Sequence, residues 1–155
     1  MFNRSMKAPI ATYITLIACL LLAACGNSKS AVKDTTQQTA IAPEKGQVWQ
    51  LVAMRGKSVS RTDNIITLMF NPEAGTFQGH SGCNRYFGNF KDLGKGKMEL
   101  SELNATKMAC AESFHKMEGA YMALLRRCDG YNLGEYTLEL TQKGKVLISF
   151  EKYRQ

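Results

Sequence analysis

The stretch that decides the fold runs from Glu112 to Cys128 and reads ESFHKMEGAYMALLRRC. Its apolar side chains recur at the spacing i, i+3, i+7, i+10, i+11 and i+14, and they are Phe114, Met117, Tyr121, Leu124, Leu125 and Cys128. A strand places alternate residues on one face and cannot produce this stripe. The stretch therefore predicts one amphipathic helix that buries its stripe against another layer of structure.

On both sides of this helix the sequence is typical of β-strands. The predicted strands before it are 48–54, 65–70, 75–80, 84–90 and 97–100, and the pair after it is 136–141 and 146–150. Residues 142–145 supply a Gly-containing turn, so the last pair is predicted to be a hairpin. One helix among so many strands predicts an α+β fold. We expect a curved antiparallel sheet, a partly closed barrel, with the amphipathic helix packed on it.

The length and composition fit a single globular domain. The chain has 155 residues, and its patterned part begins near Gln47. About 110 residues are enough for one hydrophobic core and too few for two typical domains. The composition is 45% hydrophobic and 21% charged, with 13 Gly and 3 Pro, which excludes collagen, a coiled coil and global disorder.

The first 24 residues are typical of a removable export signal. Arg4 and Lys7 precede residues 8–22, which are uncharged and mostly apolar. This segment is shorter than the roughly 20 residues that a membrane-spanning helix needs. The sequence Leu-Ala-Ala-Cys at 22–25 resembles a bacterial lipobox, whose cysteine becomes the first mature residue and receives diacylglycerol and a fatty acyl chain such as palmitate. The alternative is a plain secretory signal cut just before Cys25.

Cys25 is accordingly the predicted lipid anchor, and the membrane is a predicted partner through it. Gly26 follows, where an Asp would resemble an inner-membrane retention signal, so we expect the cell outer membrane. Residues 26–45 are rich in Ser, Thr and Gln and predict a flexible tether. The predicted organisation is thus a signal peptide at 1–24, lipidated cysteine and tether at 25–46, and a folded domain at 47–155.

The charge pattern argues against a nucleic-acid partner. The formal charge is +7, and loss of Arg4 and Lys7 leaves 18 basic and 13 acidic residues, or +5. The densest basic cluster is Lys91, Lys95 and Lys97, and an acidic residue interrupts it. A nucleic-acid-binding domain is expected to show a basic stripe with interleaved aromatic residues. The scattered excess instead predicts a solvated basic surface.

Three of the five cysteines remain in the predicted domain. Cys110 and Cys128 flank the helix, which spans about 22 Å, whereas a disulfide needs Cα atoms within about 7 Å. Cys128 also lies on the apolar stripe, which predicts a buried free thiol. In the oxidising space outside the cytoplasm, Cys83 and Cys110 are predicted to form a disulfide that stabilises the fold by roughly 3 kcal/mol.

Zinc is the competing interpretation of these cysteines. His80 lies three residues before Cys83, and His115 lies five residues after Cys110. Two nitrogen and two sulfur ligands at such spacings resemble a zinc site. The same cysteines cannot be both disulfide-bonded and metal-bound, and the exported location favours the disulfide. We therefore predict no metal and no cofactor.

Two short blocks precede the predicted helix. They are Ser-Gly-Cys-Asn-Arg-Tyr-Phe-Gly at 81–88 and Ala-Thr-Lys-Met-Ala-Cys at 105–110, and a helix with a Glu and a strand pair follow them. In this order the blocks resemble the META domain family, which includes the HslJ-like heat-shock lipoproteins of bacteria. The resemblance covers roughly residues 47–150, and Cys128 departs from it. It implies a single META domain, an envelope location and a link to stress or drug tolerance.

The candidate binding surface lies in the first block and the helix. It consists of Asn84, Arg85, Tyr86 and Glu118. The alternative gives these residues structural roles, with Glu118 in an ion pair with Arg85 or Lys107. No nucleophile elbow, phosphate loop or carboxylate pair is present in the sequence. The predicted function is a non-enzymatic envelope lipoprotein that binds an envelope protein or a small ligand, or supports stress tolerance.

Two other functional hypotheses make structural predictions. A carrier or pilot protein would hold an acyl chain or a partner segment in a half-open barrel, in an apolar groove lined by residues such as Phe70, Phe77 or Met98. An enzyme or inhibitor would gather polar groups in a cleft, and its support in the sequence is the trio of His80, Cys83 and His115.

Overall fold

The computed structural model describes residues 42–60 and 65–154. The predicted signal peptide, Cys25 and residues 26–41 lie outside the described residues. Residues 42–46, which the sequence analysis places in the tether, contact the domain: the backbone N–H of Gly46 donates to the carbonyl of Phe70 at 3.3 Å, and Lys45 pairs with Glu73. Within 42–60 and 65–154, no helix has the length and apolar character needed to cross a bilayer.

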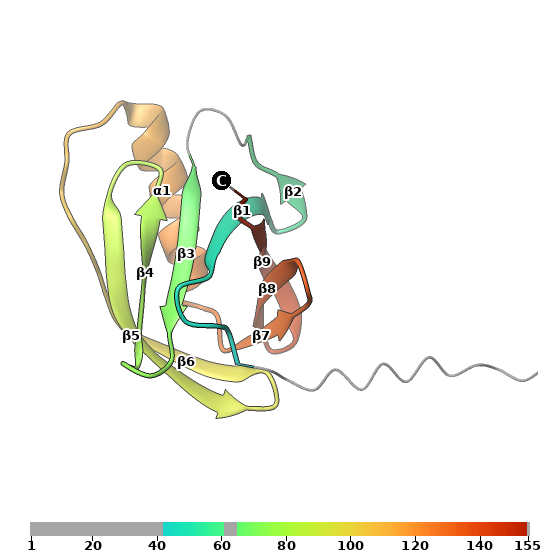
Figure 1. Cartoon of the computed structure of the whole chain (residues 1–155). Coiled ribbons are helices and arrows are strands. Elements are labelled where there is room, and N and C mark those ends of the chain that lie inside the picture. The colour runs from blue at the N-terminus through green and yellow to red at the C-terminus, as the bar shows by residue number, and fades with distance from the viewer. Residues whose placement is uncertain (1–41, 61–64, 155) are drawn as a thin grey trace, which may run out of the picture. The chain divides into compact units, whose positions relative to one another are not determined.

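Nine antiparallel strands form one sheet in the described part of the chain. They are β1 (Val48–Met54), β2 (Lys57–Ser58), β3 (Ile66–Asn71), β4 (Thr76–Ser81), β5 (Arg85–Gly94), β6 (Lys97–Ala105), β7 (Gly130–Leu133), β8 (Thr137–Gln142) and β9 (Lys145–Lys152). The order is β2-β1-β3-β4-β5-β6-β7-β8-β9, and β1 also pairs with β9. The sheet therefore curls back on itself (Figure 1).

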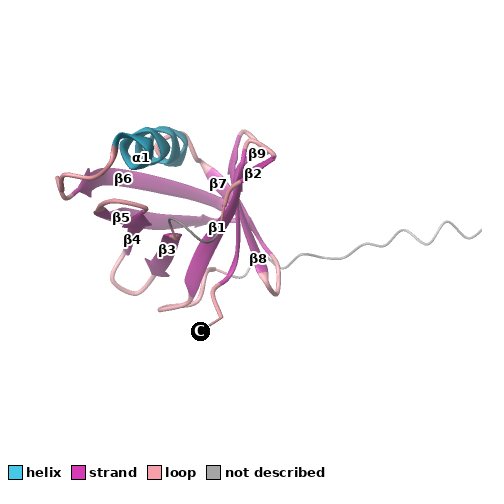
Figure 2. Ribbon diagram, turned by 90° about the horizontal axis from the view of Figure 1, so that it is seen from above, coloured by secondary structure: helices cyan, strands magenta, loops and turns pink. Residues whose placement is uncertain are grey.

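The curled sheet is not a regular barrel, because one junction is weak. β6 and β7 share a single register pair, Lys97 with Gly130, whereas β5 and β6 pair along most of their length. Helix α1 (Glu112–Leu125) lies at one side of the curled sheet, and its contacts include β4 and β9. Figure 2 shows the helix on one side of the sheet, outside the strands. The predicted α+β fold, a curved antiparallel sheet with one helix packed on it, is confirmed.

The core lies between the inner face of the sheet and the helix. Alternate residues of β3 are buried, and so are alternate residues of β5 up to Phe90, as the pleat requires. The largest fully buried side chains are Trp49, Tyr86, Tyr121, Phe70, Phe77, Phe150, Ile66, Leu68, Leu125, Leu138, Leu140 and Ile148. On α1 the predicted stripe is confirmed from Tyr121 onward, whereas Phe114 and Met117 are only half-buried.

The strands differ from the predicted ones chiefly in length. β1 has the predicted bounds, and the predicted hairpin pairs Leu138 with Phe150 and Leu140 with Ile148. β5 and β6 run past their predicted ends, and β2 and β7 were not predicted at all. The helix ends at Leu125, and Gly130, which follows a four-residue connection, opens β7.

Candidate functional site

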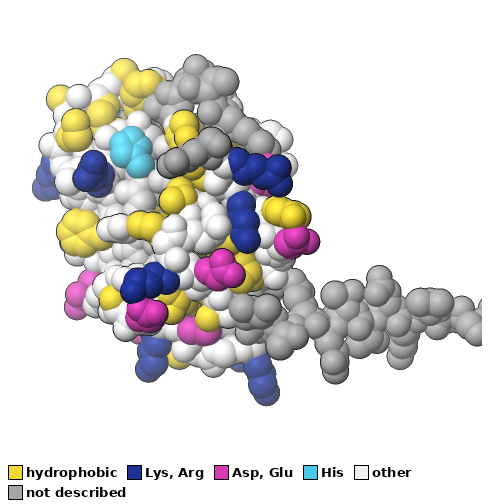
Figure 3. Space-filling view, viewed as in Figure 1, with side chains coloured by type: hydrophobic (Ala, Val, Ile, Leu, Met, Phe, Trp, Pro, Cys, Tyr) yellow, Lys and Arg dark blue, Asp and Glu magenta, His cyan; other side chains and the backbone are white. Residues whose placement is uncertain are grey.

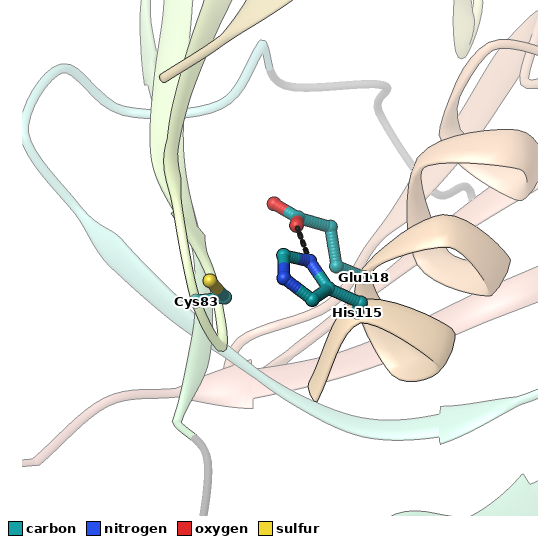
Figure 4. Close-up of side chains that lie close together, drawn as sticks. All are labelled: Cys83, His115 and Glu118. Carbon is teal, nitrogen blue, oxygen red and sulfur yellow. Dashed lines mark ion pairs between the residues drawn. The ribbon is translucent and has the colours of Figure 1, made fainter. Parts of the chain in front are cut away.

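Three segments converge at one corner of the domain. They are the turn 81–84 between β4 and β5, the loop 106–111, and the first half of α1. We call this place the polar corner and define it by Ser81, Cys83, Asn84, Thr106, Cys110, His115 and Glu118. Figure 4 shows the Cys83 sulfur on the strand side and the His115 and Glu118 side chains reaching out from the helix toward it.

Asn84 connects all three segments. Its side chain is buried, and its Nδ2 donates to Glu118 Oε2 at 2.8 Å. Its Oδ1 accepts from the Thr106 hydroxyl at 2.9 Å and from the backbone N–H of Met108 at 2.8 Å. A buried amide left without partners costs about 1–3 kcal/mol. Asn84 therefore fastens both the loop and the helix to the start of β5.

Glu118 is the acidic centre of the corner. Its side chain is 13% exposed, its Oε1 accepts from the Ser81 hydroxyl, and its Oε2 lies 3.7 Å from His115 Nδ1. Hydrogen bonds to an ionised acceptor are stronger than neutral ones. The partners of Glu118 are thus Ser81, Asn84 and His115, and not Arg85 or Lys107 as the sequence suggested.

The disulfide joins the turn to the loop. Cys83 and Cys110 are bonded, with their Cα atoms 6.2 Å apart, which confirms the predicted pairing. The backbone N–H of Cys110 donates to His115 Nε2 at 3.4 Å. The Cys83 sulfur, a His115 nitrogen and a Glu118 oxygen all lie within 4.8 Å of one another.

His80 does not belong to this group. Its Nδ1 accepts from the backbone N–H of Gly82 at 3.1 Å, and its own backbone N–H donates to the Thr67 hydroxyl. The trio on which the enzyme hypothesis rests is therefore not assembled as one cluster. Cys83 and His115 lie together, but the Cys83 sulfur is committed to the disulfide.

The candidate binding surface divides into exposed and buried residues. Arg85 is exposed, whereas Tyr86 is 1% exposed and Asn84 4%. The Tyr86 hydroxyl donates to the Thr67 carbonyl at 2.6 Å and accepts from the Tyr121 hydroxyl at 2.6 Å. Burial raises the pKa of both phenols. Asn84 and Tyr86 are almost fully buried, and their hydrogen bonds help to hold the fold together.

Cys128 is the free cysteine of the described residues, and it is buried as predicted. Its thiol donates to the carbonyl of Leu124 at 3.3 Å, one turn back along the chain. Burial, and to a lesser degree the charge of Asp129, raises the pKa of the Cys128 thiol to about 12. Because the thiolate is the nucleophilic form, Cys128 is inert in the folded domain.

The apolar groove that the carrier hypothesis requires is filled. Phe70, Phe77 and Met98 are at most 2% exposed and belong to one continuous core. Phe70 packs against Phe90 with ring centroids 4.6 Å apart. These side chains therefore pack in the core and expose almost none of their apolar surface to a ligand.

A hollow of about 420 Å³ lies beside the polar corner. Asn84 and Glu118 form part of its lining, and the charged side chains of Lys107 and Arg126 and the ring of His115 line it as well. The exposed side of the corner therefore brings basic groups near one carboxylate.

A larger hollow, of about 620 Å³, lies at the turns of two hairpins. We call it the lysine hollow, because Lys95, Lys97 and Lys143 line it around the apolar side chains of Leu93 and Tyr131. On the face that Figure 3 shows, basic and acidic side chains are interspersed. The lysine hollow is therefore a concave region with an excess of positive charge.

Sequence reasoning did not single out Ser81 or Thr106, although both lie in the two sequence blocks. Each hydroxyl bonds to a residue far along the chain, Ser81 to Glu118 and Thr106 to Asn84. The available signal was the occurrence of short polar residues two positions before Cys83 and four positions before Cys110. Such residues are suited to bonding backbone and side chains at turns.

Comparisons with known proteins identify what the chain is similar to. A family model described as "META domain" matches residues 42–154. An NMR structure of a protein from Burkholderia xenovorans is 25% identical, with a TM-score of 0.57 over 72% of this chain and 84% of that one. A crystal structure of a DUF4847 family protein from Bacteroides vulgatus is 19% identical, with a TM-score of 0.51 over 70% and 94%, and shows the fold alone. A search of curated proteins finds no match.

Proposed function

Because the chain belongs to the META domain family, we propose that it is a non-enzymatic lipoprotein of the bacterial cell envelope. Lipid on Cys25 anchors it to the outer membrane, and the following polar residues tether the domain to that anchor. The domain acts as a binding module that supports the envelope under stress.

One observation carries this proposal: Leu-Ala-Ala-Cys at 22–25 follows an apolar segment and precedes a polar stretch that leads into the family domain. A single acyl chain gives only marginal membrane binding, whereas several chains on one cysteine give stable anchoring. A tether of about 20 residues reaches roughly 25 Å at coil statistics. The domain would thus work close to the membrane surface.

The geometry of the polar corner supports a non-enzymatic role. Catalytic bases and nucleophiles need a free reactive atom aimed at a substrate. Here the Glu118 oxygens accept from Ser81 and Asn84, and the Cys83 sulfur is bonded to Cys110. These groups are used to hold the helix, the loop and the sheet together.

The lysine hollow supports a binding role for the domain. Lys95, Lys97 and Lys143 surround it. The Asp129 carboxylate, which also lines it, accepts from the backbone N–H of Lys143 at 2.8 Å and is partly engaged. Near an anionic membrane surface each Lys contributes about 1 kcal/mol. The chemistry that fits this hollow is a phosphate or carboxylate group of the envelope, borne by a lipid or by a polymer.

The anchor is tested by labelling cells with radioactive palmitate and recovering the protein. The wild type is expected to carry label in the outer-membrane fraction, and Cys25→Ser is expected to lose both the label and the membrane location. Cys19→Ser is the matched control, because it changes a cysteine inside the predicted signal. Label retained by Cys25→Ser, or lost by Cys19→Ser alone, would contradict the proposed anchor.

The binding role is tested with the mature chain, residues 25–155, carrying Cys25→Ser so that it has no lipid. We expect it to sediment with vesicles that contain phosphatidylglycerol and to bind purified anionic envelope polymer, with affinity that falls as salt is added. Replacing Lys95, Lys97 and Lys143 with Gln should weaken this binding by at least about tenfold. The control replaces Lys57, Lys107 and Lys116 with Gln, which changes the net charge equally. Equal losses in both triple variants would reject the hollow as the binding face.

A further inference from the structure

We propose that reduction of the Cys83–Cys110 disulfide turns the polar corner into a zinc site with Cys83, Cys110, His115 and Glu118 as ligands. The Cys83 sulfur, a His115 nitrogen and a Glu118 oxygen already lie within 4.8 Å of one another. The Cys110 sulfur is bonded to that of Cys83 and so adjoins the same point. This donor set differs from the one that spacing suggested, because Glu118 takes the place of His80.

The distances agree with tetrahedral coordination. Zinc binds nitrogen and oxygen at about 2.0–2.2 Å and sulfur at about 2.3 Å. Two ligands of one tetrahedral ion therefore lie about 3.3–3.8 Å apart. His115 Nδ1 and Glu118 Oε2 are 3.7 Å apart, and both come from one face of α1 at i and i+3. The three atoms of the group need to approach by no more than about 1 Å.

Cys110 has to move farther than the other three ligands when zinc binds. The two sulfurs must separate from a covalent bond to about 3.8 Å when both bind one zinc ion. Cys110 lies in the loop 106–111, which forms neither helix nor strand and is largely exposed. Cys83, in contrast, is buried in the short turn between β4 and β5. The exposed loop can supply the movement while the sheet and the helix keep the other three ligands in place.

Hydrogen bonds around the ligands support them in the way that outer partners support known metal sites. Ser81 and Asn84 hold the Glu118 carboxylate, and Asn84 Nδ2 also donates to the Cys83 sulfur at 3.4 Å. The latter bond favours a thiolate at that position. These contacts orient two ligands before any ion arrives.

The charge balance is also favourable. Two thiolates and one carboxylate around Zn²⁺ leave one negative charge. Lys107 and Arg126 line the adjoining hollow, along with His115 and Glu118. The same hollow gives a hydrated ion a path to the ligands.

The chemistry involves two steps. A dithiol reductant transfers two electrons and two protons: its own pair becomes a disulfide, the Cys83–Cys110 bond breaks, and two thiols form. Zinc then forms two Zn–S bonds and releases the two thiol protons to solvent. The oxidised domain has no thiolate at this corner, so the disulfide and the zinc-bound state exclude each other.

The test uses the full-length chain in detergent with Cys19→Ser and Cys25→Ser, so that thiols outside the domain do not contribute. The protein is reduced under nitrogen, freed of reductant, incubated with Zn²⁺ and desalted, and zinc is measured by mass spectrometry. We expect about one zinc per reduced chain and almost none per oxidised chain. Cobalt in place of zinc should give thiolate-to-metal charge-transfer absorption. Equal zinc in the two redox states, or no zinc in either, would overturn the proposal.

Two variants separate the site from adventitious binding. His115→Ala alters a half-exposed side chain, so folding should persist, and it should weaken zinc binding to the reduced protein by at least about tenfold. Cys128→Ser, checked for native circular dichroism, removes the remaining thiol and should bind zinc like its parent. The proposal fails if His115→Ala binds as tightly as the parent, or if Cys128→Ser loses the cobalt absorption.

Discussion

The two halves of α1 are held to the domain by different means. Tyr121, Leu124 and Leu125 in the second half are buried in the core. In the first half, Phe114 and Met117 are only half-buried, and the fastening comes from the polar corner. There Glu118 bonds to Ser81 and Asn84, and the disulfide ties the loop before the helix to the turn between β4 and β5.

The difference shows how a small sheet can hold a helix that only partly faces its core. Apolar burial is non-directional and scales with area, so it serves where the helix meets many core side chains. Hydrogen bonds and a disulfide fix individual atoms, so they serve where little apolar area is available. The docking of the second half of the helix should therefore depend on the volume of its buried side chains. The docking of the first half should depend on its hydrogen-bond partners and on the disulfide.

The largest effect is expected from truncation in the core half. Leu125→Ala removes a fully buried side chain and should lower the free energy of unfolding by about 2–5 kcal/mol. Leu93→Ala is the matched control, because that side chain is 51% exposed, and it should change stability by less than about 0.5 kcal/mol. Urea unfolding measures both variants. Similar losses of unfolding free energy in the two variants would contradict the claim that apolar burial holds the second half of the helix.

The next effect is expected from loss of the disulfide. Replacing both Cys83 and Cys110 with Ser should cost about 2–4 kcal/mol, because the unfolded chain gains freedom. The melting temperature should fall, and reductant should lower that of the wild type by a similar amount. The double variant itself should not respond to reductant. A double variant as stable as the wild type would show that the bond contributes nothing to the corner.

A smaller effect is expected from Glu118→Gln. The amide keeps the shape but loses the negative charge, so the hydrogen bonds from Ser81 and Asn84 to an ionised acceptor are replaced by weaker neutral ones. The expected cost is about 1–3 kcal/mol. Glu112→Gln is the control, since Glu112 is exposed and pairs with the equally exposed Lys116, and it should cost at most about 0.5 kcal/mol. Equal costs in urea unfolding would mean that Glu118 acts as a surface charge.

The smallest effect at neutral pH is expected from Tyr121→Phe, at about 1 kcal/mol for one hydrogen bond. This variant also tests pH dependence. Burial raises the pKa of Tyr86 and Tyr121 above 10, so the unfolded state loses these protons first and stability falls as the pH rises above about 10. The wild type should lose more stability between pH 8 and 11 than Tyr121→Phe. Equal losses of stability in the two proteins over this pH range would contradict a contribution from the buried Tyr86–Tyr121 pair.

Much of the fold could be predicted from local patterns. The spacing from Phe114 to Cys128 identified the helix, and alternation identified β1 and the last hairpin. β7 was not predicted, because its four residues, which begin with Gly130, show no alternation of apolar and polar side chains. Its position depends on β8, with which it pairs throughout its length. No local pattern carries that information.

The site was predictable only in part. The disulfide and the buried thiol followed from helix length and compartment, and the structure has both. The interior position of Asn84 did not follow, because a polar residue beside exposed Arg85 suggests a surface. Its partners lie 22 to 34 residues away, at Thr106, Met108 and Glu118. Such distant pairing is set by the sheet and not by spacing.

The measurement that tests the division of α1 most directly is hydrogen exchange along the helix, in the oxidised protein and after reduction without metal. Reduction is expected to speed exchange of amides at 115–118 and to leave those at 121–125 protected, because the core that holds them is unchanged. Equal loss of protection in both halves, or no change in either, would contradict the account that each half is held by its own means.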